Sequence, residues 1–488
     1  MSTGPVSAIA AATDFAHGLV AAALNRQLHP ADSRFVLESL GDLIDELRRA
    51  DRAGVPMPLA LDFDEDTILY AGTPLLGPSL QARSLLRRCR ERHVAQLAFL
   101  PGLGVDEANR LFDLLLLPNN VDCFGAAHCE RTLAACGIRN VRVGSHEPPP
   151  HASGDAAERR ALHHYQDLAD CLQQSHVLAH RDLELPVEAA SSLVERTISD
   201  LDEPSLLLSL STQDNVDRFT VGHSVRVALL ALQVARSLGA QRQQLVQIGT
   251  AALLHDIGKS KVPQEVLWKR GRLDPDEWHA MQQHPRLGAQ ILLEQHTHVD
   301  PYTVGAAFCH HMGPTGKGYP VPSLPIAPSN ISCLVRVCDV FEALTAVRPY
   351  KQALSPLEAY AVMFRNEHDF HPQWLRRFTR VLGLFPAGMR VLLDDGSLAV
   401  VTAQTAHVER PRVRLLTGAD GGDLVADQPR DLIIGEAHEG AVRRVMGIDM
   451  PDRHVAVPEF DPADPAAHDV RTAADACLPG AHDGDGCR

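Results

Sequence analysis

The sequence predicts a mainly α protein, in which a helical domain lies between an N-terminal α+β accessory domain and a small C-terminal β module. Three observations predict this class. Residues 219–367 read as one helix after another, interrupted only at glycines and prolines. Short strand-like runs alternate with helical patterns before residue 146. Short apolar runs flank turn residues between 387 and 434.

Residues 1–146 make up the predicted accessory domain, whose expected role is regulation or dimerisation. Apolar residues recur at helical spacing from Phe35 to Leu47, after a candidate cap at Asp32 or Ser33. The strand-like and helical patterns of the remaining sequence predict strands at Leu59–Phe63, Thr67–Gly72, Val94–Leu100 and near Cys136–Val143, and helices at Ser79–Arg92 and Asp106–Leu117.

The rest of the chain divides by composition. Residues 147–200 are expected to be a proline-containing linker and a helical connector, and residues 201–370 the helical domain. Residues 371–450 should form a helix and the β module, with strands at Val391–Leu393, Leu398–Val401, Val413–Leu416 and Leu432–Ile434. Residues 451–488, rich in Asp, Pro, Ala and Gly, are expected to be disordered.

Charge and composition exclude several classes of partner. The net charge of −15 disfavours binding to a nucleic-acid backbone, which requires a positive face, so no DNA partner is expected. The leucine runs are far shorter than the ~20 apolar residues of a membrane span, so no membrane insertion is expected. Ten cysteines without a CxxC pair favour free thiols and a cytoplasmic location.

Residues that commonly bind metals are concentrated in the helical domain. They are His223, His255, Asp256, His284, His310, His311 and Asp339. His255 and Asp256 follow an apolar run that we expect to be a buried helix ending at Gly258, and the pair His310-His311 precedes Gly313-Pro314. His284 stands before a proline and so at a helix junction.

Asp339 lies in an apolar run, where a lone carboxylate would lose its hydration at a cost of several kcal/mol. A metal ion would supply the missing partner. Imidazole and carboxylate ligands without thiolate suit iron or manganese at least as well as zinc, and the sequence does not choose among them.

Several motifs in a fixed order resemble the HD-GYP branch of the HD phosphohydrolase superfamily. They are His255-Asp-Ile-Gly-Lys259, the pair His310-His311 followed by Gly318-Tyr-Pro320, and the segment from Asp339 to Arg348-Pro-Tyr-Lys351. The approach to the first histidine, Asp217-Arg-Phe-Thr-Val-Gly-His223, also fits. The resemblance covers roughly residues 200–370.

The resemblance implies a helical domain that binds two divalent metal ions and hydrolyses cyclic di-GMP to pGpG. Whether the product is hydrolysed further to GMP is left open. One ion would be held by His223, His255, Asp256 and Asp339. The other would be held by His284, His310 and His311, with Asp256 bridging the two. Relatives that bind a third ion have a glutamate four residues before the first histidine, and here that residue is Phe219.

The same resemblance implies how the substrate is held. Asp256 and Lys259 are the expected catalytic residues, and Lys259 would reach a phosphate oxygen or the attacking water. Arg348 and Lys351 would contact the phosphates or a guanine edge. Lys317 would add positive charge, and Tyr319 would either pack on a base or serve only the structure of its loop. Diguanylate cyclase-type proteins or a second copy of the chain are the further partners considered.

Two residues depart from the pattern of the family. Met312 stands where the family has Glu after the histidine pair, and Thr315 stands where it has Asp. Second-sphere carboxylates orient metal ligands, and losing one commonly costs about 10–100-fold in affinity or activity. The sequence therefore leaves open a catalytically degraded module that only binds cyclic di-GMP or a protein, and a hydrolase of another cyclic dinucleotide.

Overall fold

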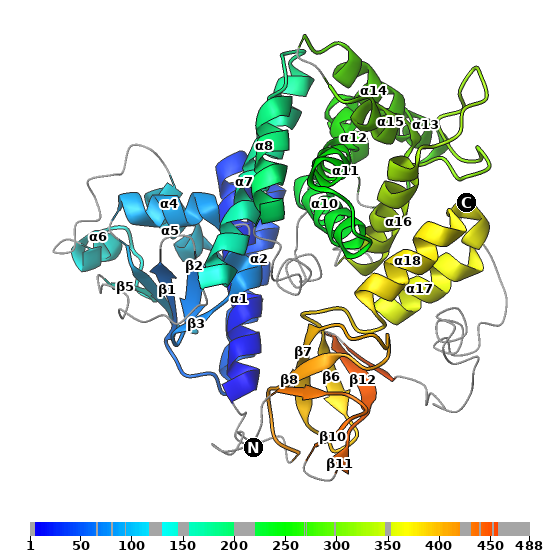
Figure 1. The fold of residues 1–488 in the computed structure, drawn as a ribbon. Coiled ribbons are helices and arrows are strands. Elements are labelled where there is room, and N and C mark those ends of the chain that lie inside the picture. The colour runs from blue at the N-terminus through cyan, green and yellow to red at the C-terminus, as the bar shows by residue number, and fades with distance from the viewer. Residues whose placement is uncertain are drawn as a thin grey trace. The chain divides into compact units, whose positions relative to one another are not determined.

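The structure, a computed structural model, divides the chain into two compact units, Met1–Gln166 and Asp167–Arg488 (Figure 1). It describes residues 5–64, 67–79, 82–92, 94–116, 129–144, 156–199, 220–267, 269, 271–296, 299–346, 353–419, 431–438, 441–450 and 453–456. We call the two parts the N-terminal unit and the C-terminal unit.

The N-terminal unit combines helices with one antiparallel sheet. Its helices are α1 (Pro5–Leu28), α2 (Arg34–Arg52), α3 (Leu76–Ser79), α4 (Arg83–Glu91), α5 (Val105–Leu116) and α6 (Cys129–Ala135). Its strands are β1 (Leu59–Asp64), β2 (Thr67–Tyr70), β3 (Thr73–Pro74), β4 (Gln96–Phe99) and β5 (Val141–Gly144), in the order β3-β2-β1-β4-β5. The predicted α+β character of this region is confirmed.

Side chains from the helices and the sheet form one core in this unit. Phe15 of α1 packs edge-on against Phe99 of β4, with ring centroids 4.9 Å apart. Within the described residues, Ala8–Gln27 of α1 is the stretch long and apolar enough to cross a membrane. Its residues Phe15, Ala16 and Leu19 are fully buried against α2 and the sheet, as in a core helix.

One local expectation for this unit needs correction. The helix expected over Ser79–Arg92 is two helices, α3 ending at Ser79 and α4 beginning at Arg83. The Ser79 hydroxyl explains the first ending, because it accepts from the Ile68 amide and donates to the Leu75 carbonyl. A side chain that bonds the strand and the preceding turn fixes the end of α3 there.

The C-terminal unit is mostly helical before residue 383. Helix α7 (Ala156–His180) crosses into it from the N-terminal unit. The other helices are α8 (Val187–Ser199), α10 (Thr220–Ser237), α11 (Arg242–Leu254), η2 (Ile257–Lys261), α12 (Gln264–Leu267), α13 (Pro275–Met281), α14 (His284–Leu293), α15 (Pro301–Cys309), α16 (Asn330–Thr345), α17 (Pro356–Arg365), η3 (Glu367–Asp369) and α18 (Pro372–Leu382).

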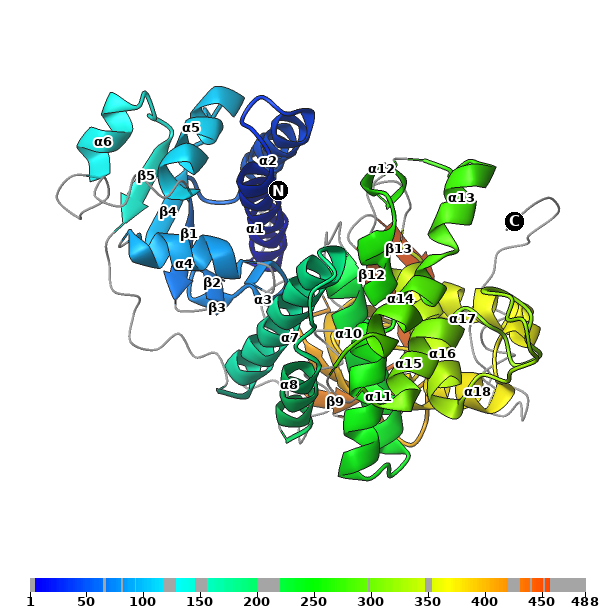
Figure 2. The same cartoon turned by 90° about the horizontal axis from the view of Figure 1, so that it is seen from above.

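Packing among these helices places the ends of several of them together. Helix α10 packs against α11 and α16, α11 packs against α15, and η2 packs against α14 (Figure 2). The starts of the helices are fixed by local chemistry. Asp300 caps α15 by accepting from the Tyr302 amide, and Ser329 caps α16 by accepting from the Ser332 amide.

The last part of the chain forms a six-stranded antiparallel sheet. The strands are β6 (Arg390–Leu393), β7 (Leu398–Ala403), β8 (Arg412–Leu415), β9 (Asp431–Ile433), β12 (Val445–Met450) and β13 (Arg453–Ala456), in the order β13-β12-β6-β7-β8-β9. A separate hairpin pairs β10 (Ala437–His438) with β11 (Ala441–Val442). The predicted β module is confirmed, and the prediction of disorder from residue 451 is wrong for β13, which pairs along β12.

Candidate metal centre

The seven candidate metal ligands converge, although they come from separate elements. His223 lies in the first turn of α10, His255 follows α11, and His284 begins α14. His310 and His311 follow the end of α15, and Asp339 lies in the middle of α16. His255, His284 and the pair His310-His311 therefore lie at helix ends, as the sequence predicts.

Gly258 makes this convergence possible, but in a different way from the one expected. It does not end α11, which stops at Leu254, and it lies inside the 3-10 turn η2. A Cβ atom on Gly258 would lie 1.9 Å from the His284 carbonyl oxygen and 2.4 Å from the Gly288 amide nitrogen. Only glycine lets the backbone of η2 touch the start of α14, and this contact brings Asp256 to His284.

One half of the centre combines imidazoles with a carboxylate, and we call His223, His255 and Asp339 the carboxylate half. His223 Nε2 lies 3.1 Å from Asp339 Oδ1 and 3.6 Å from Asp256 Oδ2. His255 Nε2 lies 3.5 Å from the same Asp256 Oδ2. The ligand atoms of His223, His255 and Asp256 are close enough to hold one metal ion.

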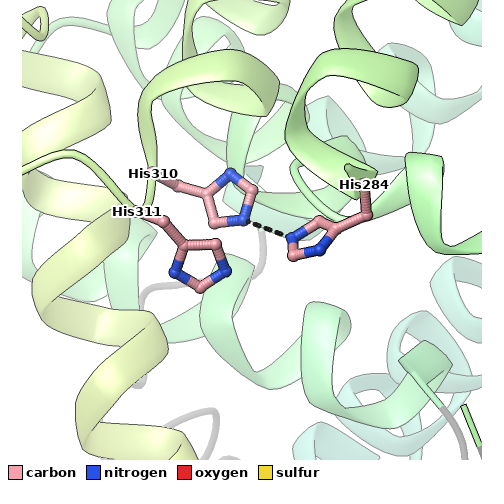
Figure 3. Close-up of side chains that lie close together, drawn as sticks. All are labelled: His284, His310 and His311. Carbon is pink, nitrogen blue, oxygen red and sulfur yellow. Dashed lines mark hydrogen bonds between the residues drawn. The ribbon is translucent and has the colours of Figure 1, made fainter. Parts of the chain in front are cut away.

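The other half contains three imidazoles, and we call His284, His310 and His311 the imidazole half. Figure 3 shows the three rings facing one another, with His284 Nε2 3.2 Å from His310 Nε2. Asp256 Oδ1 lies 3.3 Å from His284 Nε2 and 3.6 Å from His310 Nε2. The two oxygens of Asp256 thus face different halves of the centre.

Hydrogen bonds to the backbone orient three of these rings. The Nδ1 atoms of His255, His284 and His310 lie 2.7 to 3.0 Å from the carbonyl oxygens of Ala252, Met281, Ala306 and Ala307. A carbonyl can only accept, so in the neutral rings Nδ1 carries the proton and Nε2 keeps a lone pair. Nε2 is therefore the atom of each ring that is free to bind a metal ion.

His223 is oriented by a charged group instead. Its Nδ1 donates to the Glu342 carboxylate, and Arg226 Nε donates to the other oxygen of Glu342 at 2.6 Å. Arg226, Glu342 and His223 are all buried. This carboxylate–histidine arrangement is a common support for metal-binding imidazoles.

The pKa of His223 is shifted in the opposite direction from the pKa values of the imidazole half and of His255, which burial lowers. Burial opposes a charge on His223, but the nearby Glu342 and Asp339 outweigh it and raise the His223 pKa to about 9. In the imidazole half burial prevails, and it lowers the pKa of His284 to about 4 and of His311 to about 3. Burial also opposes the ionisation of Asp256, yet Lys259 and the surrounding histidines hold its pKa well below the usual range.

Divalent metal ions fit this arrangement. Among the described residues, His255 Nε2 and Asp256 Oδ1 are buried and make no hydrogen bond. The lone pairs of His284 and His310 face each other at 3.2 Å, which is unfavourable unless a cation lies between them. Two nitrogens that both bind the same ion at about 2.0–2.1 Å can be this far apart. The donor set, nitrogen and oxygen without sulfur, is suited to such ions.

The remaining candidate site residues lie around this centre. Lys259 Nζ donates to Asp256 Oδ2, and Lys317 is exposed on the loop after His311. Tyr319 stacks on His311 with ring centroids 4.6 Å apart. Arg348, Lys351 and Phe219 lie outside the described residues, so their predicted roles stay predictions.

The loop that departs from the family pattern is tightly closed. Met312 is buried and pairs with Gly318 across the loop, and the Gly313 amide donates to the Lys317 carbonyl at 2.7 Å. Gly318 has φ +105°, and a Cβ atom there would lie 2.2 Å from the His311 carbonyl oxygen. This closure carries Tyr319 back onto His311. Thr315 is exposed at the outer end of the loop.

Sequence reasoning assigned no role to three residues of the site. Glu342 and Arg226 form the second sphere of His223, and helical spacing was the available clue, because each lies three residues after a ligand on its own helix. Trp278 of α13 is 46% exposed, and its ring centroid lies 5.9 Å from that of Tyr319. Its position depends on how α13 packs, which the sequence pattern does not indicate.

Comparisons with known proteins agree with this geometry. The HD domain family matches residues 210–373. Cyclic di-GMP phosphodiesterase PA4108 of Pseudomonas aeruginosa is 36% identical over 380 residues, covering 76% of this chain and 84% of its own length. Cyclic di-GMP phosphodiesterase response regulator RpfG of Xanthomonas campestris is 31% identical, covering 41% of this chain and 52% of its own length.

A third relative has a different substrate in its name. The 3'3'-cGAMP-specific phosphodiesterase 3 of Vibrio cholerae is 36% identical, covering 34% of this chain and 36% of its own length. The match to the first relative is longer than either compact unit and so extends over parts of both. With the convergent ligands and the Gly-Tyr-Pro loop, these matches show that the chain belongs to the HD-GYP branch of the HD phosphohydrolase superfamily.

Proposed function

We propose that this chain is a phosphodiesterase that binds two divalent cations and hydrolyses cyclic di-GMP to pGpG. The observation that carries the proposal is the position of Asp256. Its Oδ2 faces His223 and His255 at 3.6 and 3.5 Å, and its Oδ1 faces His284 and His310 at 3.3 and 3.6 Å. A carboxylate between two sets of imidazoles is suited to bridging two cations.

The carboxylate half with Asp256 would hold one cation and the imidazole half with Asp256 the other, with iron or manganese favoured. When bound, such a pair lowers the pKa of water and stabilises negative charge on the attacking and leaving oxygens of a phosphodiester. The protein itself keeps Asp256 ionised and keeps the Nε2 lone pairs of the imidazole half available at neutral pH.

Residues beside the centre would bind the substrate. The Lys259 side chain is 21% exposed and would donate to a phosphate oxygen after leaving Asp256. Tyr319 and Trp278 present adjoining aromatic rings at the imidazole half, and such rings are suited to stacking on a nucleobase. Lys317, and Arg348 and Lys351 beyond the described residues, would add positive charge for the phosphates.

Cyclic di-GMP is favoured over other cyclic dinucleotides by the relatives. The relative that matches most of this chain is named for cyclic di-GMP, whereas the 3'3'-cGAMP-specific relative matches about a third of it. A hydrolysis panel of cyclic di-GMP, 3'3'-cGAMP and cyclic di-AMP, with pGpG and GMP resolved by chromatography, tests this choice.

The deciding experiment combines metal analysis with that panel. We expect purified protein to contain two cations per chain and to release pGpG from cyclic di-GMP, and we expect Asp256→Ala to lose both properties. A matched control is Asp45→Ala, which removes an exposed carboxylate that pairs with Arg48 on α2 of the N-terminal unit. A fully metal-loaded protein that hydrolyses no member of the panel would contradict the proposal.

A second candidate function, binding of cyclic di-GMP without turnover, is favoured by the loop after His311. Met312 is 1% exposed at the position where the family has a glutamate, and so offers no carboxylate to the centre. Tight binding without product would support this function. Turnover gained in Met312→Glu but not in the size-matched Met312→Gln would assign the defect to the missing charge.

For the rest of the chain we propose the roles expected from its composition. Residues 1–146 would act in regulation or self-association, and residues 201–370 would form the hydrolase domain that meets cyclic di-GMP in the cytoplasm. Diguanylate cyclase-type proteins are the proposed protein partners. Size measurement of the purified chain with and without cyclic di-GMP tests self-association.

A further inference from the structure

Helix α7 brings one more histidine toward the metal centre. The C-terminal end of α7 is fastened to η2, the turn that follows Asp256. His180 Nδ1 lies 2.9 Å from the Ser260 carbonyl oxygen, and Lys261 Nζ donates to the His180 carbonyl at 3.2 Å and to Asp182 at 2.6 Å. These bonds hold the last turn of α7 against the segment that carries the bridging carboxylate.

His176 lies one helical turn before His180 and so on the same face of α7. Its Nε2 is buried and, among the described residues, has no hydrogen-bond partner. Because His180 contacts η2 from this face, His176 faces the turn that follows Asp256, within range of the charges of Asp256, Lys259 and His255. A buried polar atom that lacks a partner destabilises a protein, and native structures rarely keep one without a reason.

The chemistry of this group points to a cation rather than to another protein side chain. The His176 Nε2 atom is buried without a partner among the described residues, and burial lowers the pKa of His176, which favours the neutral ring. One nitrogen of a neutral imidazole offers a lone pair. The substrate is a less suitable partner, because the Nε2 atom is closed to solvent. Among the groups proposed for this centre, a cation and the water bound to it both accept a neutral imidazole as a partner.

We propose that His176 is an eighth residue of the metal centre, with its Nε2 binding a cation directly or through one water molecule. This inference rests on the metal centre of the proposed function. It extends the centre from the helices of the hydrolase domain to the connector helix, in which no metal ligand was expected.

The test is made on the full chain loaded with cobalt(II), whose visible absorption reports ligand number and geometry. We expect His176→Leu to change the cobalt spectrum and to weaken cobalt affinity, measured by competition with a chelator, by about 10–100-fold. The metal-induced rise in Tm should shrink, while the Tm of the metal-free protein stays the same or rises. A merely structural role would shift both Tm values together.

The matched control is His163→Leu, which removes an exposed histidine earlier in the same helix and should leave the spectrum unchanged. If His176→Leu fails to fold, His176→Gln keeps a polar group of similar reach and is measured in the same way. An unchanged cobalt spectrum and affinity in the folded variant would overturn the role of His176 alone. Failure of the unmutated protein to bind cobalt would overturn the metal centre and this proposal together.

Discussion

The two halves of the candidate metal centre differ at His223, whose electrostatic setting is opposite to that of the histidines in the imidazole half. In the carboxylate half, Asp339 and Glu342 surround His223 with negative charge and raise its pKa to about 9. In the imidazole half, neutral rings lie among other neutral rings, and burial lowers their pKa values. The comparison teaches that one half presents negative charge, whereas the other presents the Nε2 lone pairs of His284 and His310, which backbone carbonyls fix in place.

The largest losses of metal content and turnover should come from removing a single ligand, either from the carboxylate half or from the imidazole half. We expect Asp339→Asn and His311→Gln each to lower the metal content from two cations per chain to about one. Turnover should fall by at least about 10²-fold in both, because the charge of the transition state is then stabilised from one side only. Elemental analysis with hydrolysis assays checks this, and two cations in either variant would contradict the assignment of that residue.

Gly258, at the contact between η2 and α14 that brings the two halves together, should be nearly as sensitive to substitution. Gly258→Ala would place a Cβ atom 1.9 Å from the His284 carbonyl oxygen, so η2 must move away from α14. We expect the free energy of unfolding to fall by about 1–3 kcal/mol and the metal content to decrease. Gly305→Ala is the control, since its Cβ would meet nothing within 4 Å, and it should stabilise α15 by about 0.5–1 kcal/mol. Equal Tm values in the two variants would refute this role of Gly258.

Substitution of Glu342, which supports His223 in the carboxylate half, should have a smaller effect that is limited to one cation site. Glu342→Gln should weaken one of the two cation sites by about 10–100-fold and leave the other unchanged. It also leaves the buried Arg226 without its carboxylate, at a cost of about 3–5 kcal/mol. The double variant Glu342→Gln/Arg226→Met should regain stability but not metal affinity. Recovery of both would mean that Glu342 acts through folding alone.

The stability of the metal-free protein should depend on pH in opposite ways through His223 and through the histidines of the imidazole half. The raised pKa of His223 gives stability that is complete below about pH 6.5 and is lost as pH rises through about 9. The lowered pKa values of His284 and His311 give the reverse, with stability lost as pH falls from 6.5 toward 4. We expect Tm to be highest near pH 6.5. His311→Gln should reduce the fall in Tm at acid pH and leave the alkaline side unchanged. A maximum of Tm well above pH 8 would contradict this prediction.

The smallest effect should come from the aromatic rings beside the imidazole half. Trp278→Leu removes a half-exposed ring next to Tyr319, and we expect KM for cyclic di-GMP to rise about 5-fold while kcat changes little. Trp374→Leu is the control, because that ring packs with Arg377 on α18 instead. Substrate should quench the fluorescence of the unmutated protein but not that of Trp278→Leu. Equal quenching in both would exclude a contact.

Sequence patterns identified candidate ligands that the structure brings together, because these residue types at helix ends form recognisable patterns. A histidine beside an aspartate after an apolar run, and a histidine pair before Gly-Pro, are unusual enough to indicate a metal site. The partners of those ligands were harder to predict. Glu342 looks like any helical glutamate until α10 and α16 pack together, and His176 lies in a connector far from the motifs.

Strand positions in both sheets were predicted to within a few residues, since apolar runs between turns define them. The strand β13 was missed because its composition resembles that of the segment around it. It forms by pairing along β12, and such tertiary pairing overrides local preference.

The main-chain contact at Gly258 has a consequence for evolution of the site. Because η2 meets α14 through backbone atoms, the span between the two sets of imidazoles is fixed by the polypeptide itself and does not depend on side-chain length. Surrounding positions, such as Met312 and Thr315 in the adjoining loop, are then free to diverge without changing that span. In a scaffold of this kind, the preference for one cyclic dinucleotide can change to another while the spacing of the candidate metal ligands stays the same.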